Sequence, residues 1–228
     1  MKEREITEEI LKIRCSGLYN RIIKRIFDFL FALILLIIIS PFVIIISIVV
    51  AITSGFPIFY RAQRGGYRGK PFKIMKFRSM VNGADKTGRD TTALNDDRIT
   101  KIGKILRKTK MDEIPQLFNI LFGNMSFIGP RPEILKYVEN FSDLELYITR
   151  VRPGITDFSS LEFINLDEVV GENNADEYFE KHVLKRKNEL RVKYVAEVSA
   201  WTDIKLFFLT VYKVIEKVFK IIFKKGRK

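Results

Sequence analysis

The sequence predicts a mixed α/β fold, helix-rich with short strands, held at a membrane as a monotopic protein by a re-entrant helix-break-helix. Three observations lead to this prediction. The stretch 29–52 contains 24 residues and no charge, which is enough to reach across the hydrocarbon core of a bilayer. Short apolar runs separated by glycines over 58–77 are typical of paired strands. The later helical patterns do not alternate regularly with strands, so a doubly wound parallel sheet is not expected.

The composition limits the possible chemistry. A chain of 228 residues, 47% of them hydrophobic, can bury one sizeable core. One cysteine, Cys15, excludes an internal disulfide, and with one histidine, His182, no zinc cluster can form. The net charge is +13, and the block 61–110 carries 15 Lys and Arg against 4 Asp and Glu. Such a block points to a phosphate-bearing partner, which can be nucleic acid, anionic lipid or a nucleotide, although a merely solvated face is the alternative.

The N-terminal part predicts how the chain meets the membrane. Residues 1–28 form a charged, amphipathic N-terminal segment, and residues 29–55 form the membrane segment. Basic residues flank the apolar run on both sides, which draws both ends to the cytoplasmic face and favours a re-entrant hairpin. A tilted spanning helix with a proline kink is the alternative. The flanking cations are Arg21, Lys24 and Arg25 before the run and Arg61, Arg64, Arg68 and Lys70 after it.

The pair Ser40 and Pro41 predicts where the membrane helix breaks. Proline cannot donate a hydrogen bond to the carbonyl of Ile37, and its ring crowds that carbonyl, so the helix bends. The Ser40 hydroxyl can satisfy one of the freed backbone groups. Each arm is then about 12 residues, or roughly 18 Å, which covers about one leaflet.

Residues 201–228 predict a basic, amphipathic interfacial helix and tail. Four lysines fall on one helical face, which suits a helix lying on anionic membrane lipids. A helix packed on the protein core is the alternative. The four lysines are Lys213, Lys217, Lys220 and Lys224.

Residues 56–200 predict the catalytic or binding body. A strand over 58–60, a glycine-rich turn at 65–69 and a strand over 72–77 form a hairpin. An apolar helix follows residue 113 and closes at Gly123, and another helix covers about 176–198. Between them, "RVRPGITDFSS" predicts a turn or short strands. Arg131 lies between two prolines, which restrict its backbone and hold its side chain in one place.

The adjacent acids Asp112 and Glu113 stand at the predicted start of a helix. Acidic residues there commonly cap free N–H groups, which is the structural interpretation. The surroundings favour chemistry, because Arg78, Arg107 and Arg131 are candidate ligands for the phosphates of a polyanion. Carboxylates in such a site repel an anionic substrate. They are therefore expected there only if a divalent cation lies between them and the substrate, or if one of them is the nucleophile that attacks phosphorus. Mg²⁺ is the natural metal, with Asp112 and Glu113 as its candidate ligands.

Six ordered motifs resemble a known family. They are "FYRAQRGG", "FKIMKFRSM", "NDDRITKIGKILRK", "MDEIPQLFNIL", "GNMSFIGPRPE" and "RPGIT", and they follow a hydrophobic "SP" segment. Together they resemble the bacterial sugar transferases, that is, the monotopic polyprenyl-phosphate phosphoglycosyl transferases, over roughly residues 20–210. The fragment "GITDFSS" departs from the pattern of many relatives, so Asp157 and Phe158 are the positions where contacts to the sugar or nucleotide are expected to differ.

The resemblance implies a reaction and a place for it. A sugar 1-phosphate passes from a UDP-sugar to polyprenyl phosphate, usually undecaprenyl phosphate, with release of UMP, and membrane glycan assembly begins. Asp112 is implied as the nucleophile that carries a phosphosugar, Glu113 as its acid–base or metal-positioning partner, and Arg107 and Arg131 as phosphate binders. Ser40 and Pro41 match the family's membrane break.

The implied location is the bacterial inner membrane, with the catalytic domain 56–200 on the cytoplasmic face. The chain lacks the large N-terminal membrane domain of longer relatives, so it is expected to be the minimal form. No nucleic-acid partner is expected. The rival interpretations are a membrane-tethered nucleic-acid-binding protein that uses the basic block against backbone phosphates, and a scaffold without catalysis.

Overall fold

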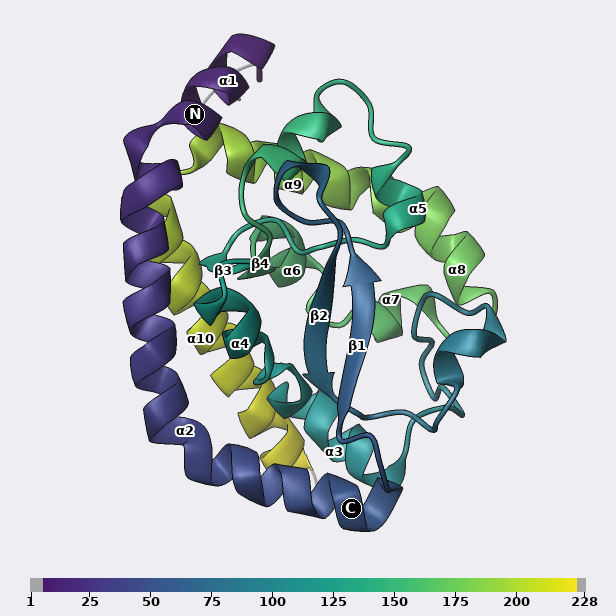
Figure 1. The fold of residues 1–228 in the computed structure, drawn as a ribbon. Helices are drawn as coiled ribbons and strands as arrows, with labels where there is room; N and C mark the ends of the chain where they lie inside the picture. The colour runs from purple at the N-terminus through teal and green to yellow at the C-terminus, as the bar shows by residue number, and fades with distance from the viewer. Residues whose placement is uncertain (1–5, 225–228) are drawn as a thin grey trace.

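The computed structural model describes residues 6–224, apart from the side chains of residues 218 and 221–224. Two long helices, α2 (Lys24–Ser54) and α10 (Ala200–Lys224), lie along one side of a body whose centre is a two-stranded hairpin (Figure 1). Helix α9 (Leu184–Glu197) lies behind the turn end of the hairpin. The mixed, helix-rich architecture with short strands is therefore confirmed.

The N-terminal helices lead directly into the membrane segment. Helix α1 (Glu8–Ser16) begins at Thr7, whose hydroxyl caps the backbone N–H of Ile10. A single π-helical turn, Tyr19–Ile23, then continues into α2, which is 31 residues long. The stretch Tyr19–Ser54 is the one helix among the described residues that is long and apolar enough to cross a membrane, and very little of its most apolar part is buried in the protein.

Helix α2 bends rather than breaks. It runs without interruption through Pro41, and Figure 1 shows its two arms meeting at a wide angle. The Ser40 hydroxyl donates a hydrogen bond of 2.9 Å to the carbonyl of Ile37, the group that Pro41 leaves without its usual donor. The predicted local repair by Ser40 is therefore confirmed. The predicted break is a bend in a continuous helix, because only one backbone hydrogen bond is lost and a side chain replaces it.

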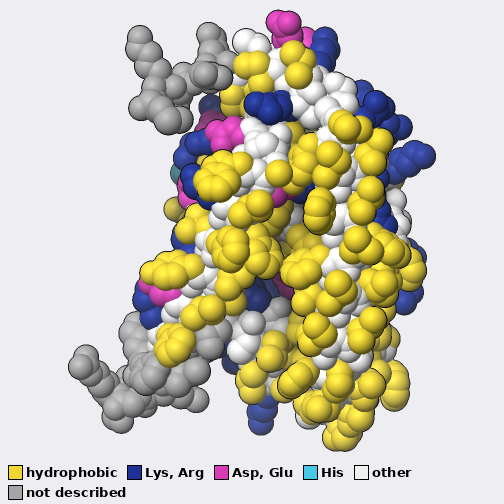
Figure 2. Space-filling model, turned by 90° about the vertical axis from the view of Figure 1, so that its left-hand side faces the viewer, with side chains coloured by type: hydrophobic (Ala, Val, Ile, Leu, Met, Phe, Trp, Pro, Cys, Tyr) yellow, Lys and Arg dark blue, Asp and Glu magenta, His cyan; other side chains and the backbone are white. Residues whose placement is uncertain are grey.

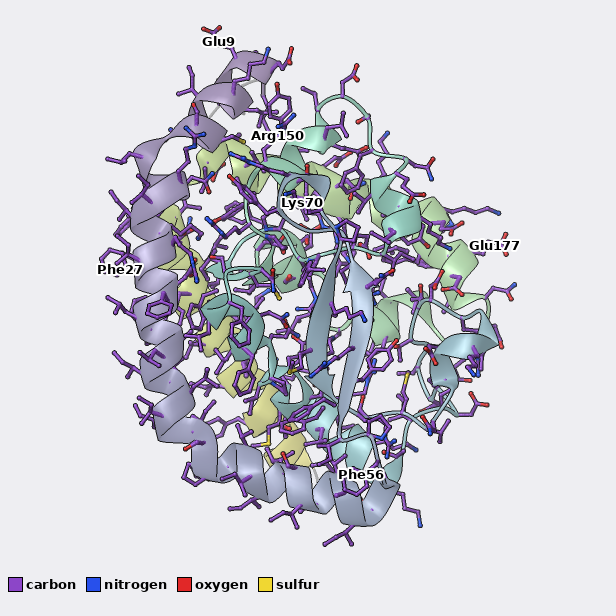
Figure 3. The ribbon with its side chains drawn as sticks, viewed as in Figure 1. Glu9, Phe27, Phe56, Lys70, Arg150 and Glu177 are labelled. Atoms are coloured by element: carbon purple, nitrogen blue, oxygen red, sulfur yellow. The ribbon has the colours of Figure 1, made fainter. Side chains whose placement is uncertain are left out.

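Apolar side chains cover the outer surfaces of α2 and α10. Figure 2 shows two columns of them side by side, one over each helix. Figure 3 shows Phe27 pointing away from the body on the outer side of α2, and Phe56 at the far end of this helix; the two residues are 68% and 75% exposed. On α10 the exposed apolar residues are Trp201, Ile204, Phe208, Leu209, Val211, Tyr212, Ile215 and Phe219. So large an apolar surface is typical of a face that lies in lipid.

The lysine face of α10 does not point where the sequence predicted. Lys213 donates to the carbonyl of Leu161 at 2.8 Å, and Lys217 donates to that of Ile164 at 3.2 Å. The expectation that the lysine face lies over anionic lipid is therefore wrong for these two residues, because the carbonyls of α6 (Phe158–Glu162) and of the chain just after it draw the ammonium groups inward. The side chain of Lys224 lies outside the described residues.

The hairpin consists of β1 (Phe59–Arg64) and β2 (Phe72–Phe77), which pair antiparallel with Phe59 opposite Phe77. Both predicted strands are confirmed, and the first extends further than expected. The two faces of β2 enter two cores, since Ile74 packs under α4 (Gln116–Leu121) and Phe77, on the opposite face, packs against α3 (Lys101–Lys108). The Asn119 side chain bonds both the N–H of Met75 and the carbonyl of Lys73 at 2.8 Å, which fixes α4 on the free edge of β2.

A second, parallel pair forms from β3 (Ser126–Ile128) and β4 (Gly154–Thr156). This confirms short strands in the "RPGIT" region. The predicted helix over 176–198 is also present, built from α8 (Ala175–Tyr178), a π-helical turn and α9. The remaining short elements are α5 (Leu135–Val138), α7 (Leu166–Val170) and the 3-10 turns Tyr67–Gly69, Ala84–Thr87, Met111–Glu113 and Glu145–Arg150.

Polar contacts join the N-terminal arm of α2 to the body. Lys24 forms a buried ion pair with Asp203 of α10, and Asp203 also accepts from Tyr194 of α9 at 2.8 Å. Arg25 donates to the carbonyls of Ile120 and Leu121 at 2.6 and 2.8 Å, where α4 ends. The guanidinium thereby caps the orphan carbonyls of α4, so the membrane helix and the helix after the acidic pair are held as one unit.

Candidate active site

The acidic pair lies in a strained 3-10 turn, Met111–Glu113, just ahead of α4. Lys110 enters this turn in the left-handed region with a φ of 60°, and Pro115 separates the turn from α4. No side chain caps the N-terminus of α4. The capping interpretation is therefore wrong for Asp112 and Glu113, because the turn places them before the helix instead of at its first residues. A left-handed residue other than glycine costs free energy and is common at functional sites.

Glu113 is held in place by two cations. Its Oε1 atom forms an ion pair with the guanidinium of Arg131, and it accepts from the ammonium of Lys76 at 3.0 Å. Burial opposes ionisation of this carboxyl, but the charges of Arg131 and Lys76 outweigh burial and hold the pKa of Glu113 well below its usual range. Glu113 is therefore a carboxylate at neutral pH, and its position is fixed.

Asp112 is buried but not bound. Its exposed fraction is 5%, and no hydrogen bond or ion pair to its carboxylate occurs within residues 6–224. Burial raises the pKa of Asp112, with the neighbouring Glu113 charge acting in the same direction, while Lys76, Arg107 and Lys110 oppose the rise. A desolvated carboxylate without hydrogen bonds keeps its lone pairs available for bond formation.

Arg131 is positioned by the parallel strand pair. One guanidinium nitrogen donates to the carbonyl of Ile155 in β4 at 2.8 Å, and the other reaches Glu113. The loop that carries Arg131 packs closely on this pair, since a Cβ on Gly154 would lie 2.2 Å from the backbone nitrogen of Gly129. Only glycine permits this approach, so the "GPRP" and "RPGIT" motifs meet here for a steric reason.

Two further predicted phosphate ligands lie in different places. Arg107 donates to the Thr92 hydroxyl at 2.8 Å. The charge of Arg107 also lowers the pKa of Asp112, so this arginine lies close enough to the acidic pair to act on it. Arg78 is 5% exposed and donates to the carbonyls of Ser54 and Gly55 at the end of α2. Arg78 therefore caps the membrane helix, whose orphan carbonyls attract a guanidinium. Its role as a phosphate ligand stays a prediction.

A polar pocket of about 130 Å³ lies on the other side of Arg131. Its charged lining comes from β1, β2, the "GPRP" loop and α9. Glu133 is the single acid, and it pairs with Arg191 at 2.6 Å and with Lys187 at 3.7 Å. The charged lining residues are Arg64, Lys76, Arg131, Glu133, Lys187 and Arg191.

The sequence pattern did not single out Lys76, Glu133, Lys187 or Arg191. One signal was available for Lys76, which shares the inward face of β2 with Ile74, a position where strand alternation predicts an apolar residue. Lys187, Arg191 and Glu133 gave no local signal, because charged residues are ordinary on a helix surface and after a proline. Only the packing of α9 on the "GPRP" loop brings them together.

Asp157, a position where the chain departs from the pattern of many relatives, has a structural role. It is fully buried and begins α6, where its carboxylate accepts from the N–H of Ser160 at 2.7 Å and from the hydroxyl of Ser159 at 2.8 Å. This arrangement is an N-cap. Its other oxygen accepts from the backbone N–H of Arg131 at 3.4 Å, so Asp157 supports the arginine loop from behind.

The fit of Mg²⁺ depends on few protein ligands. No group of three or more His, Cys, Asp or Glu side chains that could enclose a metal occurs among the described residues. Mg²⁺ at nucleotide sites is commonly held by one or two carboxylates together with waters and substrate phosphates. The acidic pair fits this mode, with the unbound Asp112 carboxylate and the second oxygen of Glu113 as donors.

The family follows from comparison with known proteins. A family model described as bacterial sugar transferase matches residues 19–217, which includes both strand pairs, the acidic pair and the bent helix. This chain belongs to that family. The expectation from the six motifs is therefore confirmed.

Curated relatives carry the names of specific transferases. The chain is 41% identical over 198 residues to UDP-glucose:undecaprenyl-phosphate glucose-1-phosphate transferase of Escherichia coli, and 34% identical over 217 residues to undecaprenyl-phosphate galactose phosphotransferase of Salmonella typhimurium. These matches cover 85% and 87% of this chain but 40% and 41% of the relatives. The chain thus spans about two fifths of the length of these relatives. It also matches 88% of the uncharacterized sugar transferase EpsL of Bacillus subtilis, at 35% identity.

We predict that Glu133→Gln destabilises the protein at neutral pH and that the effect fades in acid. Burial opposes ionisation of Glu133, but Lys187 and Arg191 lower its pKa from the ordinary 4.5 to about 2. The unfolded chain binds a proton more readily, so this stabilisation is full above about pH 4.5 and is lost as the pH falls toward 2. The free energy of unfolding of the wild type should exceed that of the variant by on the order of 3 kcal/mol at pH 7.

Thermal unfolding in detergent at pH 7 and pH 3 measures this gap. Glu139→Gln, the same change at an exposed position, is the control and should leave the melting temperature unchanged at both values. A gap between wild type and Glu133→Gln that stays constant from pH 7 to pH 3 would contradict the prediction.

Proposed function

We propose that this protein transfers a sugar 1-phosphate from a UDP-sugar to polyprenyl phosphate, with undecaprenyl phosphate as the expected carrier, and releases UMP. The observation that carries the proposal is the unequal state of two adjacent carboxylates, since Glu113 is bound by two cations whereas Asp112 is buried and unbound. The names of the relatives support the class of substrate. The step would begin assembly of a membrane glycan.

The proposed reaction has two displacements at one phosphorus atom. A carboxylate oxygen of Asp112 forms a bond to the β-phosphorus, the bond from that phosphorus to the bridging oxygen breaks, and UMP leaves with the bonding electrons. An oxygen of polyprenyl phosphate then attacks the same phosphorus, and the bond to Asp112 breaks. One phosphoanhydride replaces another, so no further energy source is needed.

The surrounding side chains supply charge and position. Phosphoryl transfer depends mainly on alignment of the reacting groups and on neutralisation of the phosphate oxygens. Lys76, Arg107 and Lys110 act on Asp112 electrostatically and are placed to meet the diphosphate beside it. Glu113 keeps Lys76 and Arg131 in position, which is the role we assign to the second acid. We further propose that Mg²⁺ is held by this acidic pair and the diphosphate, and that it neutralises the leaving phosphate when bound.

The membrane arrangement supports a meeting of lipid and soluble substrates. We propose that α2 enters and leaves the bilayer on the cytoplasmic face of the inner membrane, with its bend at Ser40 and Pro41 deepest in the lipid. Both ends of α2 are tied to the catalytic body, through Arg25 at α4 and through Arg78 at the last turn. Because one body holds both ends, a helix that returns to the same face fits this connectivity.

We predict that Asp112→Asn abolishes UMP release. An amide cannot attack phosphorus, so turnover should fall by more than about a thousandfold. Arg131→Ala should lower it about a hundredfold, because it removes a preorganised cation and frees Glu113. The assay uses purified protein, Mg²⁺, undecaprenyl phosphate and a panel of UDP-sugars, with exposed Asp143→Asn as the control. Mass spectrometry of the enzyme given Mg²⁺ and a UDP-sugar, without polyprenyl phosphate, should find a sugar phosphate on Asp112, and normal turnover of Asp112→Asn would end the assignment.

We predict that Lys76→Met moves the acid limb of the pH–rate profile to higher pH. Burial already raises the pKa of Asp112, and the rate should rise with pH as this carboxyl ionises. Lys76 is the cation that most strongly opposes the rise, so without it the pKa of Asp112 increases further. Lys73→Met removes the same charge from an exposed position of the same strand and should leave the limb in place. An unmoved limb in Lys76→Met would show that the titrating group is not Asp112.

We predict that the residues before and after α2 lie on the same side of the membrane. Burial raises the pKa of the Cys15 thiol to about 11, which makes this native cysteine a slow probe. Exposed Lys12→Cys and Gln63→Cys, each in a Cys15→Ser background, are better ones. A membrane-impermeant maleimide should label both in inverted vesicles and neither in intact spheroplasts. Labelling of the two positions from opposite sides would establish a spanning helix.

A further inference from the structure

The residues that line the pocket beyond Arg131 carry more positive than negative charge. Of its cations, Lys76 and Arg131 already face Glu113. Within the lining, the three that remain, Arg64, Lys187 and Arg191, face one acid, Glu133. The charges of Asp157 and Asp90 act on Lys187 and Arg64 from outside the lining. An excess of positive charge in a partly desolvated pocket is costly unless an anion from outside completes it.

The hydrogen bonds of these three cations are also incomplete. Arg191 is 1% exposed, and its buried Nε atom has no hydrogen-bond partner among the described residues. Lys187 is 7% exposed, and its ammonium makes no hydrogen bond with the described residues, only the 3.7 Å ion pair with Glu133 and a contact above the Phe179 ring. Arg64 donates a hydrogen bond of 2.8 Å to the carbonyl of its own neighbour, Gln63. Donors are therefore available to an oxyanion.

The location of the pocket indicates which substrate it meets. No lining residue belongs to α2 or α10, the two helices that expose apolar surface. The pocket is bounded by the hairpin, the "GPRP" loop and α9 (Figure 1), so a soluble molecule reaches it more directly than a lipid does. Two groups of cations result, one that acts on Asp112 and one around Glu133, with Arg131 between them.

We infer that this pocket is a second oxyanion subsite for the soluble donor, which binds a phosphate or carboxylate group other than the phosphoryl group that Asp112 attacks. This inference rests on the proposed function. Two parts of a donor can supply such a group. One is the α-phosphate of the nucleotide, and the other is a carboxylate on the sugar ring.

Ligand binding tests the inference without turnover. All forms carry Asp112→Asn and are studied as the full chain in nanodiscs of neutral lipid, by calorimetric titration with UMP, UDP-glucose and UDP-glucuronate. The test variant is Lys187→Met. The matched control is Lys185→Met, the same change at an exposed position of the same helix, which should bind all three ligands like the parent. Arg64→Gln is the second test variant, because its side chain has no structural partner beyond its own neighbour and its loss should leave folding intact.

The pattern across ligands identifies the anion. If the subsite takes the α-phosphate, the test variants should bind all three ligands at least about tenfold more weakly, as expected for loss of a charge-assisted hydrogen bond. If the subsite binds a sugar carboxylate, the test variants should bind only UDP-glucuronate more weakly than the parent does. Binding of all three within twofold of the parent, by test variants with unchanged melting temperature, would overturn the inference. Failure of the proposed function would appear separately, as absence of UMP release by the enzyme with Asp112 intact.

Discussion

The ion pairs that Arg131 and Lys76 form with Glu113 are the interaction on which the site depends. Two carboxylates adjacent in sequence repel each other when buried, and two cations on one of them settle which carboxylate is bound. Asp112 then keeps free oxygens within a field of positive charge. The same pairs tie the turn to β2 and to the "GPRP" loop, so the position of Asp112 and the fold of the surrounding body have one common support.

The membrane helix belongs to this support as well. Arg25 caps the last carbonyls of α4, the helix that follows the acidic pair, and Arg78 caps the last carbonyls of α2. Asp28 adds a third contact, because its carboxylate accepts from the N–H of Phe127 in β3 at 3.1 Å. Charged groups on a membrane helix are costly in lipid, and here they face the protein. These contacts hold α2 in a fixed position relative to the acidic pair.

The structure of the basic block 61–110 explains why its net charge alone could not decide which class of phosphate-bearing partner the protein binds. Arg98 is buried and paired with Asp96 at 2.7 Å, Arg78 faces backbone carbonyls, and Lys76 faces Glu113. These three cations point into the protein, whereas others of the block, such as Lys101 and Lys104, are exposed. Two lysines of α10, Lys213 and Lys217, likewise turn toward carbonyls of the body. A helical wheel gives the angle between side chains, but it does not say which face meets the protein.

The sequence by itself was enough to predict most helices and strands and to identify Asp112 as the candidate nucleophile. Local signals suffice for these, because a charge-free run, strand alternation, a proline after a serine and an acidic pair before a proline each act within a few residues. Tertiary structure alone decided that α2 bends without breaking, that Glu113 is the bound acid, and that Glu133, Lys187 and Arg191 line one pocket. Lys187 and Glu133 lie far apart in the chain, and their proximity follows from the packing of α9 on the "GPRP" loop. Such long-range contacts leave no periodic trace in one sequence, since each charged residue alone looks like ordinary surface.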